Sequence, residues 1–267
     1  MQLSYDKKIF TVISDLHGKF KQVSIRKSDY LLICGDMINR SQPEKMDDFV
    51  DWLKQLDVKH ILIVYGNHEK KVKKQFTEKL SSLSNVHVLE NDICIFDDIQ
   101  FYGFSFHIGD EEFEKAMKVI DPSKKCVLLA HKPPFRIRDL RLKNLKKMKE
   151  GYKCCGSYEL KDVCKLVKPE LCCFGHCHYS SGMKRIGNTL YINASVMNEF
   201  QEVVNKPTEL MFNGQMFHHG SWSDSSSCLF AIDAKPYVKK SVILSQQANT
   251  QQTMSDILLM TCPIVAC

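Results

Sequence analysis

Short apolar runs recur along the chain, and each run ends abruptly in glycine or polar residues. The five clearest runs cover residues 9–14, 30–34, 61–65, 126–130 and 171–174. Because consecutive rather than alternate positions are apolar, both faces of each strand are expected to be buried. The pattern therefore predicts an α/β fold built on a mostly parallel sheet.

Helical spacing fills several of the intervals between these runs. In residues 43–56, apolar side chains recur every three or four positions, and Pro43 suits the first turn of a helix. Further helices are predicted over residues 69–80, over residues 111–120, and over residues 158–167 with Ser157 as the N-cap. Residues 93–96 and 99–104 predict a hairpin, and residues 189–194 predict another strand.

Each of the five apolar runs leads directly into residues of the kinds that bind metal ions. In chain order these are Asp15-x-His17, Gly35-Asp36-x-x-x-Arg40, Gly66-Asn67-His68-Glu69, His131 and Gly175-His176-x-His178. Because the carboxyl ends of parallel strands lie along one edge of a sheet, we expect these residues to converge there. Carboxylate, imidazole and amide ligands together suit a pair of divalent or trivalent transition-metal ions. Two ions about 3.5–4 Å apart can clamp the attacking and leaving oxygens of a displacement at phosphorus.

The ordered motifs DxH, GDxxxR, GNHE, HxPP and GHxH resemble those of the calcineurin-like metallophosphoesterases over about residues 9–207. The spacing and the stretch His131-Lys132-Pro133-Pro134 resemble most closely the phosphodiesterase-like branch of metallophosphoesterase domain-containing proteins. Protein Ser/Thr phosphatases share the first three motifs but lack this HxPP stretch and the paired histidines. The resemblance implies a four-layer αββα sandwich of two mixed sheets flanked by helices.

The resemblance also implies metal ligands. Asp15, His17 and His178 would hold the first ion. Asn67, His131 and His176 would hold the second ion, and Asp36 would bridge both. The residues themselves do not name the metal, and Mn, Fe, Zn or Co would all suit this donor set.

Three residues are implied as substrate contacts. His68 would assist the leaving oxygen without binding metal, Asn67 would face the phosphate, and Arg40 would neutralise phosphate charge. A hydroxide bridging the two ions would attack phosphorus in line. For Arg40 an ordinary surface ion pair is an equal alternative, and Glu69 is explained by the dipole at a helix N-terminus.

Charge is concentrated in one segment, residues 136–153. The chain carries 37 Lys and Arg against 31 Asp and Glu, a net charge of +6, and this segment alone has eight basic and two acidic residues. It is either a solvated helical face or a positive rim that steers an anionic substrate. Only Phe135 and Tyr152 flank it as aromatics, so nucleic acid is not the favoured partner.

Cysteines cluster between residues 154 and 177, but no CxxC pair occurs, which argues against a zinc framework. Cys177 lies between His176 and His178, and the alternation of side chains predicts that its thiol points away from the metal site. The chain has twelve cysteines, shows no signal peptide at its start and contains no long apolar run. We therefore expect an intracellular, cytoplasmic protein with reduced thiols and no membrane partner.

The 267 residues, 44% hydrophobic and 25% charged, exclude wholesale disorder and fibrous structure. We predict a catalytic domain over residues 1–220, with the basic insertion at 136–153, and a partly ordered extension over residues 221–267 with strands near 229–232 and 238–244. The predicted activity is hydrolysis of phosphodiesters, such as cyclic nucleotides or other small nucleotidic diesters. A phosphomonoesterase, including a protein phosphatase, remains the alternative. A nuclease or an inactive scaffold is less favoured, since every ligand position and His68 are present.

Overall fold

A computed structural model describes residues 7–143 and 151–219 of the chain. The predicted extension, including the strands proposed near 229–232 and 238–244, lies outside these described residues. So does the middle of the basic segment.

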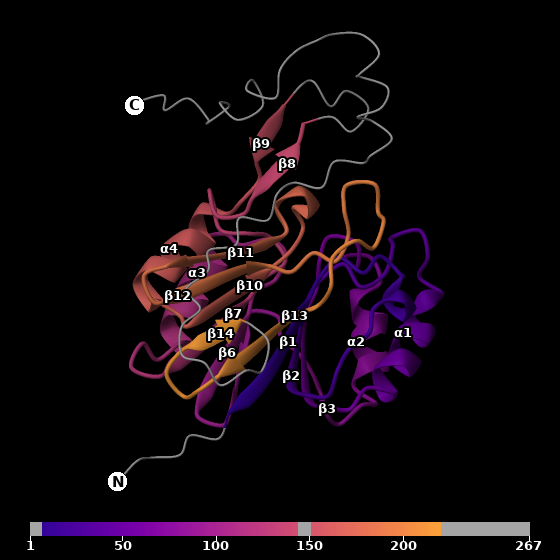
Figure 1. The fold of residues 1–267 in the computed structure, drawn as a ribbon, viewed down its shortest axis with the longest axis horizontal. Helices are drawn as coiled ribbons and strands as arrows, with labels where there is room; N and C mark the ends of the chain where they lie inside the picture. The colour runs from indigo at the N-terminus through magenta and orange to yellow at the C-terminus, as the bar shows by residue number, and fades with distance from the viewer. Residues whose placement is uncertain (1–6, 144–150, 220–267) are drawn as a thin grey trace. The chain divides into compact units, whose positions relative to one another are not determined.

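Two six-stranded mixed sheets form the centre of the fold (Figure 1). Sheet I has the order β14-β13-β1-β2-β3-β4, with β1 Lys8–Ile13, β2 Ser28–Cys34, β3 Val58–Val64, β4 Val86–Val88, β13 Thr208–Phe212 and β14 Phe217–His219. Sheet II has the order β11-β12-β10-β7-β6-β5, with β5 Asp92–Phe96, β6 Ile99–Gly103, β7 Lys125–Leu129, β10 Leu171–Phe174, β11 Gly182–Ile186 and β12 Thr189–Asn193. The central strands of each sheet are parallel, and antiparallel strands add to the edges.

Helices cover the outer face of each sheet. Helices α1 (Lys45–Lys54) and α2 (Lys73–Leu80) pack on sheet I, whereas α3 (Asp110–Val119) and α4 (Tyr158–Val167) pack on sheet II. Along β2, Leu31 and Ile33 contribute to the core beneath α1 and α2, and the alternating residues Tyr30 and Leu32 contribute to the core between the sheets. Both faces of the strand are buried, which is why its sequence is continuously apolar. The four-layer αββα architecture is therefore confirmed.

The local signals for helix and turn ends hold in detail. The Ser157 hydroxyl accepts a hydrogen bond from the Leu160 backbone N–H at 3.1 Å, which caps α4 as expected. Lys168, with a φ of 52°, ends that helix. Asp97 and Asp98 have φ values of 48° and 60°, which suit the tight turn of the β5–β6 hairpin.

Helix α2 begins at Lys73 rather than at residue 69. Glu69 is fully buried and accepts hydrogen bonds from the backbone of two neighbouring loops, so it faces the interior instead of opening a helix. Glu69 is therefore explained by its buried hydrogen bonds and not by the dipole of a helix.

The described parts of the basic segment form turns and two short strands rather than a helix. Strand β8 (Leu140–Leu142) pairs antiparallel with β9 (Tyr152–Cys154), and Arg141 lies opposite Lys153. This two-stranded sheet is separate from sheets I and II (Figure 1).

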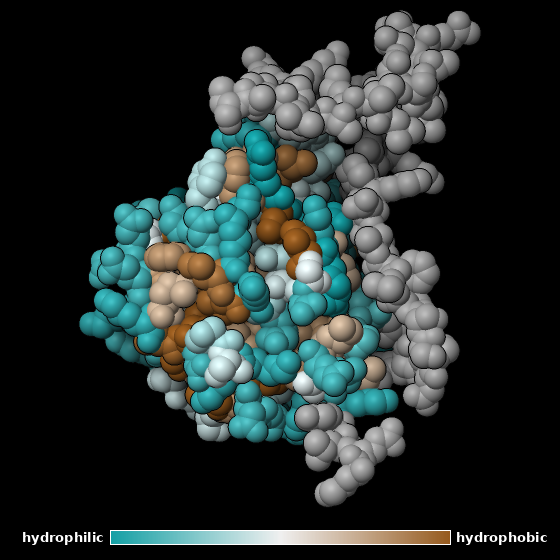
Figure 2. Space-filling model, turned by 90° about the vertical axis from the view of Figure 1, so that its left-hand side faces the viewer, coloured by the Kyte–Doolittle hydropathy of each residue, from teal (hydrophilic) through white to brown (hydrophobic). Residues whose placement is uncertain are grey.

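No helix among the described residues is long and apolar enough to cross a membrane. Figure 2 shows one face of the molecule, on which hydrophilic side chains surround smaller hydrophobic areas. On the helices that cover sheet II, the exposed hydrophobic side chains include Val119, Tyr158 and Leu166.

Candidate metal centre

The predicted ligand residues come together where the carboxyl ends of parallel strands from the two sheets meet. Their loops follow β1, β2 and β3 in sheet I and β7 and β10 in sheet II. The two sheets are joined at this end, because Ser14 after β1 pairs with Ser195 after β12. The expectation that one edge of a single sheet carries the site was therefore wrong, since two stacked sheets each supply part of it.

Sharp backbone turns present several of these side chains. Asp15, His17, Asp36 and His176 have φ values of 59°, 44°, 53° and 65°, in the left-handed region that residues other than glycine seldom adopt. Such conformations cost free energy and persist where the surrounding structure holds them, commonly at functional sites.

Gly35 shows how closely the motif loops approach one another. A Cβ atom at this position would lie 2.7 Å from the Gly66 backbone nitrogen and 2.7 Å from Nδ1 of His131. Its φ of 88° also favours glycine. The glycine therefore allows the loops after β2, β3 and β7 to meet.

Asp15, His17 and His178 form the first cluster of possible ligand atoms. The distance from Nε2 of His178 to Oδ1 of Asp15 is 3.3 Å, and Nε2 of His178 lies 3.3 Å from Nε2 of His17. Two imidazole nitrogens this close favour a positive charge between them, either a proton or a metal ion.

Asp36, His131 and His176 form the second cluster. Oδ2 of Asp36 lies 3.2 Å from Nε2 of His131 and 3.8 Å from Nε2 of His17. The Asp36 carboxylate is 2% exposed and thus lies between a residue of the first cluster and a residue of the second.

Hydrogen bonds set the tautomers of three of the histidines. Nδ1 of His17 donates to the side-chain oxygen of Asn39 at 3.1 Å. Nδ1 of His131 donates to the Cys34 carbonyl at 2.7 Å, and Nδ1 of His178 donates to the Asn198 carbonyl at 3.0 Å. In each neutral ring, Nε2 then offers a lone pair to the cluster, as a metal ligand requires.

Two buried polar atoms near the second cluster have few contacts with other polar groups. Within the described part of the chain, Oδ1 of Asn67 has no hydrogen-bond partner, and the contact of Nε2 of His131 is the ion pair with Asp36. Buried polar atoms are normally paired, so an unpaired acceptor at this position suits a ligand of a metal ion. Together with the carboxylates and imidazoles around them, they fit transition-metal ions.

The electrostatics of the centre also favour a cation. Burial alone would lower the pKa of His131, but the carboxylates of Asp36 and Asp15 outweigh it and raise this pKa to about 10. Burial alone would raise the pKa of Asp36, but His131 outweighs it and lowers the pKa to about 2. Burial lowers the pKa of His17 to about 4 and that of His176 to about 3, so both rings are neutral.

His68 and Arg40 lie beside the clusters. Nε2 of His68 is 3.9 Å from Oδ2 of Asp36, while Nδ1 accepts a hydrogen bond from the Arg40 backbone N–H at 3.3 Å. The Arg40 guanidinium donates to the Asn67 carbonyl at 3.1 Å. Arg40 is thus placed against the two residues that follow Gly66, and it is not one of the described residues that line the cleft over the candidate ligands.

Residues 9–180 match the family model described as calcineurin-like phosphoesterase. The chain belongs to this family. The phosphoesterase is 26% identical to UPF0046 protein K07C11.7 of Caenorhabditis elegans, over 73% of this chain and 72% of that protein. It is 25% identical to human metallophosphoesterase domain-containing protein 1, over 74% of this chain and 69% of that protein.

Solved structures share the fold of this phosphoesterase. Phosphopantetheinyl hydrolase from Mycobacterium tuberculosis aligns with a TM-score of 0.55 at 14% identity, over 82% of this chain and 98% of that one. TT1561 of Thermus thermophilus aligns with a TM-score of 0.55 at 10% identity, over 80% of this chain and 99% of that one.

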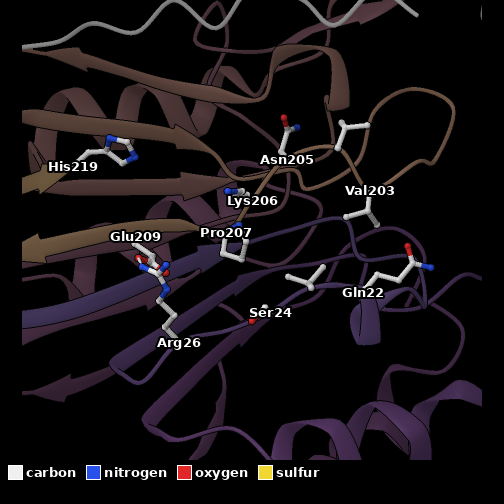
Figure 3. Close-up of a pocket in the computed structure, with 11 residues that line it drawn as sticks. Gln22, Ser24, Arg26, Val203, Asn205, Lys206, Pro207, Glu209 and His219 are labelled. Carbon is white, nitrogen blue, oxygen red and sulfur yellow. Dashed lines mark hydrogen bonds and ion pairs between the residues drawn. The ribbon is translucent and has the colours of Figure 1, made fainter. Parts of the chain in front are cut away.

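The phosphoesterase has a small cleft of about 140 Å³ over the clustered side chains. Arg141 and Leu142 of β8 line one part of it, and Glu199 and Gln201 line another. A larger groove of about 710 Å³ lies elsewhere, between the segment around Arg26 and strand β13 (Figure 3). None of the described residues that line this groove belongs to the clusters of possible metal ligands, so the smaller cleft is the candidate site.

Several residues around the site escaped sequence reasoning. Asn39 and Asn198 orient histidines, and Glu69 fastens the motif loops together. Asn39 lies within the GDxxxR motif, and its polar side chain next to Arg40 could have indicated a role at the site. Cys177 is placed as expected, because its buried thiol donates to the Asp139 carbonyl at 3.4 Å rather than joining the clusters.

Proposed function

We propose that this phosphoesterase hydrolyses phosphodiesters at a dinuclear metal centre, with small nucleotidic diesters, including cyclic nucleotides, as substrates. The observation that carries the proposal is the position of the buried Asp36 carboxylate between His17 and His131. One carboxylate that faces both clusters suits two neighbouring ions better than two separate sites.

Asp15, His17 and His178 would hold one ion, Asn67, His131 and His176 the other, and Asp36 both. Such ions supply Lewis-acid stabilisation of the phosphate and lower the pKa of bound water. The chain's own residues orient this chemistry, because Asn39, Cys34 and Asn198 fix the rings of His17, His131 and His178.

His68 is proposed to assist the leaving oxygen as a hydrogen-bond donor. Since its Nδ1 accepts the Arg40 backbone N–H, the proton of the neutral ring resides on Nε2, which faces Asp36 and the cleft. Burial lowers the pKa of His68, with the Asp36 carboxylate opposing this. A neutral ring held by its Nδ1 bond can direct its Nε2 N–H at the leaving oxygen and stabilise the charge that develops there by a hydrogen bond.

The charge of the rim supports a diester over a monoester. Arg141 brings one positive charge to the cleft and Glu199 brings one negative charge, so the two together are close to neutral. A diester carries one negative charge and a monoester carries up to two, and the dianion needs more compensation from the protein. Arg141 is also the residue of the basic segment through which that segment would meet the substrate.

The test begins with metal-stripped protein to which Mn, Fe, Zn, Co or Mg is restored singly. Turnover is compared for a diester, the matching monoester and a panel of 2′,3′- and 3′,5′-cyclic nucleotides. We expect metal-dependent turnover with the diester ahead of the monoester, and Asp36→Asn should lose both metal and activity. A preference for the monoester would replace the proposal with a phosphomonoesterase, and no metal-dependent turnover on any phosphate ester would reject it.

A further inference from the structure

Cys155 and Cys177 form a contact between the basic hairpin and the proposed ligand loop. Cys155 directly follows β9, and Cys177 lies between His176 and His178. Their thiols lie close enough to influence each other's ionisation. The Asp139 carbonyl joins them as well, because it accepts the Cys155 backbone N–H at 3.0 Å and the Cys177 thiol at 3.4 Å.

Asp139 and Asn193 hold this pair in place. One carboxylate oxygen of Asp139 accepts the backbone N–H of Arg136 at 3.0 Å and that of Gly156 at 3.1 Å, which closes the base of the hairpin. The Asn193 side-chain amide donates to the Cys177 carbonyl at 2.8 Å. The thiols therefore meet on anchored backbone rather than by the chance contact of two loose loops.

The two thiols differ in access. Cys155 is partly exposed, whereas Cys177 is 0% exposed. The hydrogen bond with Cys177, helped by the charges of Lys153 and Arg141, lowers the pKa of Cys155 to about 6. An accessible thiolate next to a second thiol is the arrangement found in reversible thiol oxidation.

We propose that Cys155 and Cys177 are a modification site, a dithiol that a hydroperoxide converts into a disulfide. The Cys155 thiolate attacks one peroxide oxygen, so that the O–O bond breaks and hydroxide leaves. The Cys177 sulfur then attacks the resulting sulfenic sulfur, the S–O bond breaks, and the thiol proton leaves with the departing oxygen as water. Two thiols lose two electrons, and hydrogen peroxide becomes two molecules of water.

A disulfide between Cys155 and Cys177 would alter the proposed metal centre although neither residue is a proposed ligand. A disulfide draws the two sulfur atoms to about 2 Å, well inside the contact distance of two thiols. Any backbone movement that the bond requires at Cys177 carries His176 and His178 with it, and any such movement at Cys155 carries the hairpin whose other strand holds Arg141. Either movement changes the cleft, so the oxidised form is expected to bind metal or substrate less well.

The experiment treats the full chain, loaded with metal, with one equivalent of hydrogen peroxide. Peptide mapping without reduction should find the Cys155–Cys177 disulfide, with a loss of 2 Da that dithiothreitol reverses. Turnover of the diester should fall at least about 5-fold and recover on reduction. The mapping does not depend on activity, so failure of the proposed function would leave this part of the test intact.

Matched variants separate this pair from other thiols. Cys155→Ser should keep basal turnover and resist peroxide, whereas the neighbouring exposed Cys154→Ser should respond like the wild type. The pair Cys164 and Cys172, with sulfurs 3.7 Å apart, is a second comparison, because both are buried. Absence of the Cys155–Cys177 disulfide, a disulfide at Cys164–Cys172 instead, or equal inactivation of wild type and Cys155→Ser would each overturn the proposal.

Discussion

The carboxylate of Glu69 accepts a hydrogen bond from the backbone N–H of Asp36 at 3.1 Å. The same group accepts the backbone N–H of Gly66 at 2.9 Å and that of Ile38 at 3.1 Å. One buried side chain thus fastens the loop that carries Asp36 to the loop that carries Asn67 and His68. Burial and the nearby Asp36 charge raise the pKa of Glu69 to about 7.

Glu69→Gln should destabilise the protein without removing a ligand. Both carboxylate oxygens accept backbone N–H groups, and the glutamine amide would set an N–H donor against one of these positions. An unsatisfied buried group costs about 1–3 kcal/mol of the free energy of unfolding. Urea denaturation of the metal-free protein measures this, with the exposed Glu78→Gln in α2 as the control. Equal stability of the two variants would contradict the role of Glu69.

His68→Ala should slow turnover and leave the metal content unchanged. Loss of a hydrogen-bond donor to the developing negative charge costs about 10²–10³-fold in kcat. His131→Ala is the comparison, because loss of a proposed ligand should deplete metal, as measured by elemental analysis after dialysis. His68 also lies close enough to His17 and Asp36 to form a third cluster of possible ligand atoms. If His68→Ala loses a metal ion, His68 is a ligand and its proposed role is wrong.

Arg141→Glu should raise KM for an anionic substrate by about 10-fold at low salt, a change of about 1.4 kcal/mol. The effect should shrink as ionic strength rises, because salt screens partly exposed charges. Lys143→Glu makes the same change of charge next to the same strand, at an exposed residue outside the cleft lining. Similar KM values for the two variants would mean that the basic segment is a solvent-exposed face that does not attract the substrate.

Gly35→Ala should be more damaging than its backbone angle alone predicts. Gly187 also has a positive φ, of 57°, but a Cβ atom there would meet nothing within 4 Å among the described atoms. Gly187→Ala should therefore cost about 1–2 kcal/mol for the left-handed backbone. Gly35→Ala adds the clash with Gly66 and His131, about 1–3 kcal/mol more. Chemical denaturation of both variants compares these costs, and equal losses would mean that the loops relax easily.

Asp97→Asn should weaken the protein at neutral pH but not in strong acid. The Tyr30 hydroxyl donates to Asp97 at 2.5 Å, and this bond, with Lys8 close by, lowers the pKa of Asp97 below its usual 3.8. A carboxyl group whose folded pKa is lowered stabilises the fold above its unfolded pKa and loses that contribution as pH falls through the folded pKa.

The stability difference between wild type and Asp97→Asn should therefore be complete above about pH 5 and vanish well below pH 3.8. Asparagine tolerates the positive φ of this turn position. Asp98→Asn, at the next position of the same turn, is the control. A difference that does not change with pH would show that the effect comes from the turn and not from the charge.

The sequence by itself predicted the buried central strands, the helices to within a few residues and the residues proposed for the metal centre. Continuous apolar runs identify strands buried on both faces, and the polar residues directly after them are close in sequence to the turns that expose them. Strands, caps and turns can be predicted from the sequence because they depend on residues adjacent along the chain. Ser157 before α4 and the Asp97-Asp98 turn follow the same logic.

Only the tertiary structure decided how distant segments meet. Two sheets rather than one supply the candidate ligands, Glu69 turns inward to bind two loops, and β8 brings Arg141 to the cleft. Cys155 reaches Cys177 for the same reason. These relationships depend on the packing of residues far apart in sequence. Hydrophobic burial fixes that packing over the whole molecule, and a local pattern of apolar and polar positions does not encode it.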